Sequence, residues 1–292
     1  MWRPDPSAPI LHEQQFRLLR DLVHAHSGLW FRDDMMYLVE RRLGARVAAL
    51  GLSGFEAYHH FLLYDPGRSE ELEDAVELLT TNETYLFREP LQLQAFQREI
   101  MPRLAKDLAG RRQLRVLSAG CSTGEEAYTA AVLVRESGLF EGWDVEVVGC
   151  DLSRRCLAQA RAGAYAESAF RSPEAERLRR WFQLRGGKWV VEDEIRRSVR
   201  FVRENLLGPR ALASVPMLDV VFCRNVMIYF DTEARRKVLG RLHARMRPGG
   251  WLLLGHSESL LGVTADFELV HLREDLVYRR PPGWTGALPE EA

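Results

Sequence analysis

The alternation of short apolar runs with amphipathic stretches between Leu114 and Leu254 constrains the fold more than any other feature of this sequence. The apolar runs at 114–118, 144–148, 218–222 and 251–254 have the length of buried strands. Helical periodicity occupies 125–136, 153–162 and 232–246, and the last stretch is followed by a Pro-Gly-Gly stop at 248–250. This pattern is typical of an α/β domain with a parallel sheet and helices on both faces.

The segment before residue 80 has a different, all-helical pattern. Apolar residues recur at helical spacing in 16–23 and 35–50, and a turn at 65–67 precedes a further helix from about 69 to 79. Ser53 and Glu56 form an S-x-x-E pair, which predicts a capping box at the start of the third helix. We therefore predict a small bundle of four helices over residues 10–80. The Pro-rich ends, residues 1–10 and 281–292, are expected to be mobile tails.

One region interrupts the alternation. Short strand-like runs at 181–184, 188–191 and 199–202, with a turn at Gly186-Gly187, predict a small antiparallel subdomain inserted at about 181–203. Two further runs, 267–271 and 276–278, flank a charged turn and predict a closing hairpin.

Composition excludes several classes of protein. The 40 basic and 41 acidic residues are balanced, which argues against a dedicated nucleic-acid-binding protein. The four cysteines show neither C-x-x-C nor zinc spacing, so they predict buried thiols in a reducing compartment and no metal site. No stretch approaches the ~18 apolar residues of a membrane span. We expect a cytoplasmic protein without membrane insertion.

The loop after the first predicted strand, Ser118–Tyr128, leads into a helix that opens with Glu125 and Glu126. It matches neither G-x-G-x-x-G nor G-K-[ST], so it is not expected to hold a phosphate. Two carboxylates at a helix start favour a cationic ligand instead. Helix capping is the alternative, because Ser122/Glu125 and Thr123/Glu126 both have capping-box spacing.

Asp151 ends the second strand, where an acidic residue can accept hydrogen bonds from a ribose diol; its alternative role is the N-cap of the helix near Ser153. Together with the glutamates it fits a nucleoside that carries an ammonium group and no phosphate, such as S-adenosylmethionine (SAM). Arg224 and Asn225 directly follow a buried strand. Polar groups there are costly unless they are satisfied, which favours a site role.

Several motifs, in order, resemble those of the CheR family of chemotaxis-receptor methyltransferases. Thr80–Glu89 resembles the segment that opens the family's catalytic domain, and Leu117–Tyr128 resembles its SAM loop. Phe222–Asp231 is similar to the family's most distinctive motif. Pro248-Gly-Gly and Gly255–Glu258 are similar to later ones. The resemblance covers about residues 10–280.

The resemblance implies a SAM-dependent protein-glutamate O-methyltransferase that needs no metal and releases S-adenosylhomocysteine (SAH). It would form glutamate 5-O-methyl esters on chemotaxis-type receptors, which are long helical bundles, for sensory adaptation. It implies a receptor-docking helical domain at 10–80 and a Rossmann-like methyltransferase domain at 81–280. A monomer is expected. The turn at 185–187 is short, unlike that of members that tether to a receptor tail, which argues against tethering.

The same resemblance assigns roles to residues. Arg88 would orient the acceptor carboxylate and Tyr229 would face the methyl group. One of the two glutamates would hold the SAM amino group, without the sequence indicating which, and Asp151 would hold the ribose. The remaining expected cofactor contacts are Asn82, Thr84, Arg88, Asn205, Leu206, Arg224 and Asn225.

Each assignment has a structural alternative. Asn82 and Thr84 could cap a helix, Asn205 could belong to a turn, Arg88 could be a surface charge, and Tyr229 a half-buried aromatic. His256 is interpreted as structural.

Receptor docking is predicted on the helix that carries Arg41, Arg42 and Arg46, where the last two share a face. Two other functions remain open on the same scaffold. One is a non-enzymatic SAM- or SAH-binding signalling module, and the other is a methyltransferase for a different substrate.

Overall fold

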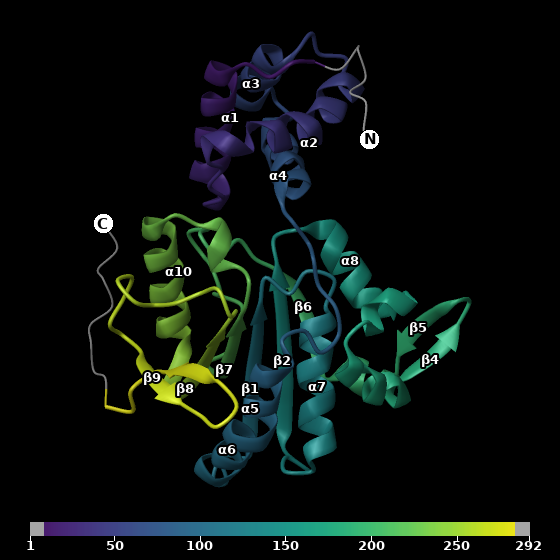
Figure 1. Cartoon of the computed structure of the whole chain (residues 1–292), viewed down its shortest axis with the longest axis vertical. Coiled ribbons are helices and arrows are strands. Elements are labelled where there is room, and N and C mark those ends of the chain that lie inside the picture. Colours follow the sequence, from purple (N-terminus) through teal and green to yellow (C-terminus); the bar gives the residue numbers. More distant parts are fainter. Residues whose placement is uncertain (1–8, 284–292) are drawn as a thin grey trace. The chain divides into compact units, whose positions relative to one another are not determined.

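The computed structural model describes residues 9–283 and divides into two compact units (Figure 1). One unit comprises Met1–Thr81 and Tyr229–Ala234, and the other comprises Asn82–Ile228 and Arg235–Ala292. Most of the expected tails, 1–8 and 284–292, lies outside the described residues. Within the described part of the chain, no helix is long and apolar enough to cross a membrane.

The first unit contains the expected helices. They are α1 (Glu13–Ser27), α2 (Met36–Ala49), α3 (Phe55–Tyr64) and α4 (Arg68–Leu79). Phe16, Leu43 and Tyr58 are completely buried between them. The capping box expected at Ser53 is wrong, because α3 begins one residue later, after Gly54, and has no side-chain cap.

Two of the three arginines of the predicted docking face are used inside this unit. The guanidinium of Arg46 binds Glu71, with Nε 2.9 Å from Oε1. Nη1 of Arg42 donates to the carbonyls of Leu79 (2.7 Å) and Thr80 (2.9 Å), where α4 ends. Burial lowers the pKa of Arg42. These two cations therefore tie helices together and do not form the open basic face that the sequence suggested.

The second unit is built on a seven-stranded sheet with the order β6-β2-β1-β7-β8-β10-β9. The strands are β1 (Gln113–Ala119), β2 (Asp144–Asp151), β6 (Val199–Arg203), β7 (Leu218–Cys223), β8 (Met246–Leu254), β9 (Glu268–His271) and β10 (Leu276–Arg279). β6, β2, β1, β7 and β8 are parallel, and the predicted closing hairpin β9–β10 adds antiparallel to β8. The mostly parallel sheet confirms the predicted fold class. The Pro-Gly-Gly segment expected before β8 lies within that strand.

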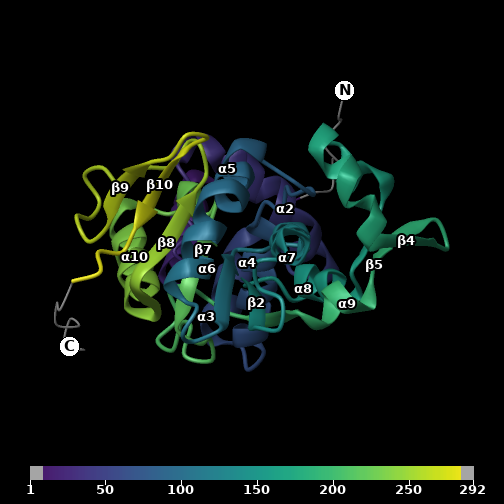
Figure 2. The same cartoon turned by 90° about the horizontal axis from the view of Figure 1, so that it is seen from below.

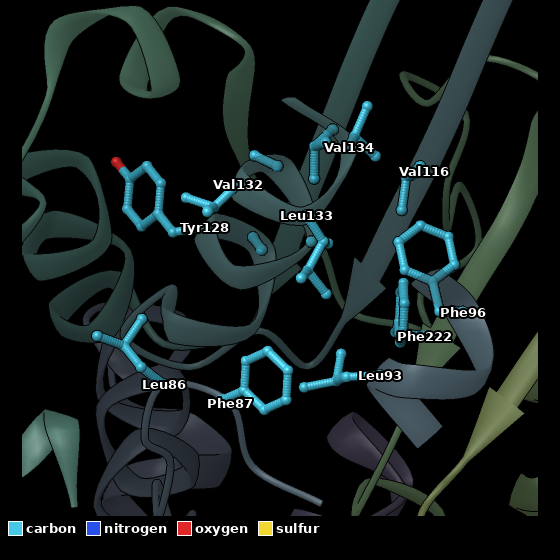
Figure 3. Close-up of a cluster of buried hydrophobic side chains, with 14 of the residues drawn as sticks. Leu86, Phe87, Leu93, Phe96, Val116, Tyr128, Val132, Leu133, Val134 and Phe222 are labelled. Atoms are coloured by element: carbon cyan, nitrogen blue, oxygen red, sulfur yellow. The ribbon is translucent and has the colours of Figure 1, made fainter. Parts of the chain in front are cut away.

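Helices α5 (Pro90–Ala95), α6 (Met101–Asp107) and α7 (Glu125–Ser137) pack their apolar side chains against one face of this sheet. Figure 3 shows part of this core, in which Phe96 packs edge-on against Phe222 of β7 at a centroid distance of 5.1 Å. Leu117 and Val221, which point to the other face, are also completely buried. Both faces of the sheet are therefore covered, as the unbroken apolar strands indicated.

The small antiparallel sheet differs from its prediction. It consists of β3 (Ala164–Tyr165), β5 (Lys188–Val191) and β4 (Phe182–Arg185), and both views show β4 and β5 at one side of the unit (Figures 1 and 2). The run at 199–202 was expected here, but it forms β6 and pairs with β2 at the edge of the main sheet. The inserted subdomain therefore does not extend to residue 203.

The remaining helices are α8 (Arg154–Ala162), α9 (Asp193–Arg197) and α10 (Thr232–Arg245). Short helical turns occupy Asp33–Met35, Phe96–Ile100, Glu167–Phe170, Pro173–Trp181 and Met227–Tyr229, and the second of these is a π-helical turn that joins α5 to α6.

Candidate functional site

The carboxyl ends of four parallel strands meet at one edge of the main sheet. Ala119 at the end of β1 lies beside Cys150, near the end of β2, and Cys223 at the end of β7 lies beside Leu254, the last residue of β8. After β1 the chain moves to β2 on one side, and it later returns to β7 on the other. Ligands of α/β proteins bind in the crevice at such a switch point.

Strained backbone gathers at this edge. Among the described residues, six non-glycine residues have a left-handed φ, and four of them lie in the predicted site segments: Phe87 (59°), Glu89 (55°), Ser122 (49°) and Asn225 (59°). Such conformations are disfavoured for side-chain-bearing residues and are concentrated at functional sites. The strain therefore supports the position inferred from the strand order.

The loop between β1 and α7 is shaped by glycine. Gly120 has φ 68°, and a Cβ atom at this position would lie 2.5 Å from Cγ2 of Val226. Gly124, with φ 92°, is the N-cap of α7, which has no side-chain capping bond. The capping boxes proposed for Glu125 and Glu126 are therefore absent, and another reason is needed for two carboxylates at this helix start.

The two glutamates have different surroundings. Oε1 of Glu126 accepts a hydrogen bond from Oγ of Ser118 (2.6 Å), and Oε2 lies 3.2 Å from Nη1 of Arg224. Oε2 of Glu125, only 4% exposed, accepts one from Oγ1 of Thr123 (2.6 Å). Burial raises the pKa of both carboxyl groups, and Arg224 partly opposes this at Glu126. Buried carboxylates of this kind are stabilised by a cationic ligand.

Asp151 connects β2 to the loop after β1. Its Oδ2 accepts the N–H of Ser122 (2.8 Å), and its Oδ1 accepts the N–H of Ser153 (2.9 Å). The N-cap of α8 is Ser153, whose Oγ accepts the N–H of Cys156 (3.0 Å). The N-cap role considered for Asp151 is therefore wrong, and its carboxylate lies beside the predicted ligand loop.

Arg224 is the centre of a buried ion-pair network. Its side chain is 2% exposed, and Nη1 binds Glu126 while Nη2 lies 3.3 Å from Oε2 of Glu89 and donates to the carbonyl of Arg88. Nδ2 of Asn225 donates to the other oxygen of Glu89 (3.2 Å). Burial acts to raise the pKa of Glu89, but Arg224, Asn225 and His256 together outweigh it and the pKa is lowered. Residues from three segments far apart in sequence thus meet here.

The two predicted catalytic residues lie in different units. Nη1 of Arg88 donates to the carbonyl of Glu83 (2.5 Å). Burial raises the pKa of Glu126, and the charge of Arg88 is one of the influences that oppose this rise. The role of Arg88 at the reaction centre stays a prediction. Tyr229 is half-buried and belongs to the helical unit, where its carbonyl accepts the N–H of Trp30 (2.9 Å). Its position facing a methyl group stays a prediction.

For the other predicted cofactor contacts, the structure excludes the structural alternative in two cases and shows it in one. Asn82 and Thr84 lie in irregular chain, and the next helix begins only at Pro90, so a capping role does not apply to them. Oδ1 of Asn205 accepts the N–H of Leu207 (3.0 Å), which is the turn considered for it. Leu206 follows as a buried residue. The cofactor roles of these four residues stay predictions.

Sequence reasoning gave no role to Glu89 or Glu258, although both lie in the quoted motifs. Glu258 accepts the backbone N–H groups of Asn225 and Gly255. Nδ1 of His256, in the same motif, lies 3.3 Å from Oε2 of Glu89. Glu258 could have been found from the occurrence of polar residues shortly after a buried strand. This signal was used for Arg224 and Asn225 after β7, but not for the residues after β8.

The donor set fits SAM. The described residues contain no group of three His, Cys, Asp or Glu side chains that could hold a metal ion. The four cysteines, Cys121, Cys150, Cys156 and Cys223, are free and buried, as predicted. Burial raises the pKa of Cys150 to about 12, so this thiol stays protonated. Besides the guanidinium of Arg224, the strand ends present carboxylates and the amide of Asn225, which suit an ammonium group and a ribose.

Comparison with known protein families gives two matches that together span nearly the whole chain. The model described as "CheR methyltransferase, all-alpha domain" matches residues 14–80. The model described as "CheR methyltransferase, SAM binding domain" matches residues 82–276.

Curated relatives agree with these matches. "Chemotaxis protein methyltransferase 2" of Vibrio cholerae is 31% identical over 274 residues, covering 93% of this chain and 94% of the relative. "Chemotaxis protein methyltransferase 1" of Pseudomonas aeruginosa is 34% identical, covering 90% and 97%. "Chemotaxis protein methyltransferase" of Vibrio parahaemolyticus is 34% identical, covering 94% and 99%.

Proposed function

The chain belongs to the CheR methyltransferase family, and from this premise we propose that it transfers the methyl group of SAM to glutamate side chains of chemoreceptors. The products would be glutamate 5-O-methyl esters and SAH. The observation that supports this most strongly is the set of three carboxylates that follow β1 and end β2, of which Glu125 is buried and Glu126 and Asp151 are half-buried, and which favours a cationic nucleoside without phosphate. We expect the protein to act as a cytoplasmic monomer without a metal.

The expected cofactor contacts follow the strand ends. Glu125 or Glu126 would hold the amino group, and Asp151 would hold the ribose hydroxyls. Asn82, Thr84, Arg88, Asn205, Leu206, Arg224 and Asn225 would complete the cofactor site. When bound, SAM supplies an electrophilic methyl group on a sulfonium.

Arg224 would act by holding other groups in place. Its guanidinium already donates to Glu126, Glu89 and the carbonyl of Arg88. These contacts fix the first turn of α7 relative to the 88–89 segment.

The acceptor needs alignment more than activation. A glutamate carboxylate, with an ordinary pKa of ~4.3, is ionised at neutral pH and is a competent nucleophile without a general base. The chain's own residues would orient it and exclude water. Because the reactants carry opposite charges and the products are neutral, a site of low dielectric favours the transfer. Arg88 would orient the incoming carboxylate, and Tyr229 would hold the geometry through its hydroxyl.

The test is incubation with SAM labelled in its methyl group and membranes that contain chemoreceptors. We expect label on the receptor that mild base releases as methanol. Arg88→Ala should lower turnover at least tenfold, ~1.4 kcal/mol or more, while SAH affinity changes less than about threefold. The matched control is Arg98→Ala. In the parent, the guanidinium of Arg98 forms a surface ion pair with Glu274. Equal turnover of the Arg88 variant and the parent would refute the role of Arg88.

The same assay separates the alternatives. SAH binding without label on any receptor would favour a non-enzymatic signalling module. Label that resists base would favour a methyltransferase for a different acceptor atom.

We also propose that residues 10–80 dock the receptor. Because Arg42 and Arg46 are engaged within the unit, the exposed Arg41 is the cation that remains for this role. Arg41→Glu should raise the KM for receptor and leave SAH affinity unchanged. An unchanged KM would refute this role of Arg41.

A further inference from the structure

One carboxylate joins the two loops that follow β7 and β8. Oε2 of Glu258 accepts the N–H of Asn225 and the N–H of Gly255, both at 2.7 Å. Its Oε1 accepts the N–H of Ile228 at 3.2 Å. A single side chain from the second loop thus satisfies three backbone donors, two of which belong to the first loop.

These donors need a partner because the sheet ends there. Cys223 and Leu254 form the last pair in the parallel ladder between β7 and β8, and the two strands end there. Asn225 has a left-handed φ of 59°, which is disfavoured for a residue with a side chain unless its surroundings hold it. The carboxylate of Glu258 supplies that restraint through a charge-assisted hydrogen bond.

Gly255 leaves the space that this arrangement needs. A Cβ atom at residue 255 would lie 2.8 Å from Nδ2 of Asn225, 2.9 Å from its backbone nitrogen and 2.9 Å from Oε2 of Glu258. The absence of a side chain at Gly255 therefore allows the carboxylate and the asparagine to approach. This steric observation is independent of the hydrogen bonds and identifies the same three residues.

The restraint reaches the charged network through Asn225. The side chain of Asn225 donates to Glu89, and Glu89 also faces Arg224. Moving the backbone of Asn225 would therefore displace an amide that holds one side of this network. Glu258 itself donates nothing to the network.

We propose that Glu258 is a positioning residue that fixes Asn225, and with it the loop after β7, in the conformation that binds SAM. This inference rests on the proposed function, because it assigns Glu258 to the same cofactor site. Glu258 acts through Asn225 and not by contact with the cofactor.

The test is a double-mutant cycle that measures the Kd of SAH by calorimetry. Glu258→Gln keeps the shape, and its single amide oxygen can still accept the N–H groups of Asn225 and Gly255 in place of Oε2, but the change removes the charge and one acceptor. We expect its Kd to rise about tenfold, and that of Asn225→Ala to rise at least tenfold. The double variant should be no more than about threefold weaker than Asn225→Ala, because both changes remove the same restraint. The control is Glu268→Gln on the exposed strand β9, with an unchanged Kd.

Calorimetric stoichiometry reports irreversibly misfolded protein, and a urea titration checks that each variant is fully folded under the conditions of the assay, so that a general loss of stability does not raise the apparent Kd. If Glu258→Gln proves insoluble, Glu258→Asp is judged by the same criterion. A variant Kd within twofold of the parent's, or effects that multiply in the double variant, would overturn the proposal. A parent protein that binds no SAH would instead refute the proposed function.

Discussion

Replacing Arg224 with methionine tests the buried ion-pair network. Methionine has a comparable length but neither the charge nor the donors of arginine. In the parent, the side chains of Glu89 and Glu126 are 14% and 15% exposed and face an arginine that is 2% exposed. Arg224→Met therefore leaves two mostly buried carboxylates without the cation that they share, and their mutual repulsion remains.

Removing one partner of a buried ion pair typically costs about 3–5 kcal/mol of folding free energy. The loss should depend on pH. In the parent, the lowered pKa of Glu89 contributes stability that is present above the unfolded pKa and is lost as the pH falls through the folded pKa. In the variant, burial and repulsion raise the pKa of both carboxyl groups above the unfolded value. The cost in folding free energy of ionising these groups is absent below their unfolded pKa and grows as the pH rises towards their folded pKa. For each group it amounts to ~1.4 kcal/mol per unit of difference between its folded and unfolded pKa.

The measurement is the free energy of unfolding from urea titrations at pH 5.0 and pH 7.5. We expect Arg224→Met to lose about 3–5 kcal/mol at pH 7.5 and at least ~1 kcal/mol less at pH 5.0. Adding Glu126→Gln should recover part of the loss at the higher pH. The control Arg98→Met, which breaks a surface pair, should cost less than ~1 kcal/mol. An equal loss at both pH values, with no recovery by Glu126→Gln, would refute the electrostatic reasoning.

Three further changes test other parts of the structure. Gly120→Ala should lower the free energy of unfolding by about 1–3 kcal/mol because φ is 68° and Val226 occupies the Cβ position; an unchanged urea midpoint would contradict this. Asp151→Ala should weaken SAH binding in calorimetry at least tenfold, ~1.4 kcal/mol, and an unchanged Kd would remove the ribose role. Glu71→Ala should destabilise the helical unit by about 3 kcal/mol because Glu71 is 4% exposed and bound to Arg46; the melting temperature checks this, and a shift no larger than for an exposed glutamate would contradict it.

Local periodicity predicted most of the fold correctly. The four N-terminal helices, β1, β2, β7 and the closing hairpin follow from apolar spacing, because each element must bury one face whatever its partners are. The run at 199–202 was assigned to the wrong sheet. Its β-branched residues predict a strand but do not indicate which strand it pairs with, and β6 pairs with β2 about 50 residues earlier in the chain.

The location of the site could also be predicted, but not its connections. Glu126 and Asp151 were identified because one opens the helix after the first strand and the other ends the second strand, and the carboxyl ends of these strands must meet. The pairing of Arg224 with Glu126 spans 98 residues, and that of Asn225 with Glu258 spans 33. Periodicity in the sequence cannot reveal contacts between residues that are so far apart along the chain. For the same reason Arg42 was expected on an open face, although its partner Thr80 lies 38 residues away.

The most direct test of the central claim is to locate the transferred methyl group by mass spectrometry. A chemoreceptor is incubated with the purified protein and SAM, digested, and its peptides are sequenced. We predict a single added methyl group on glutamate side chains, removed by mild base and absent when SAM is omitted. A methyl group on another side chain, or none on the receptor while the protein binds SAH, would contradict the claim.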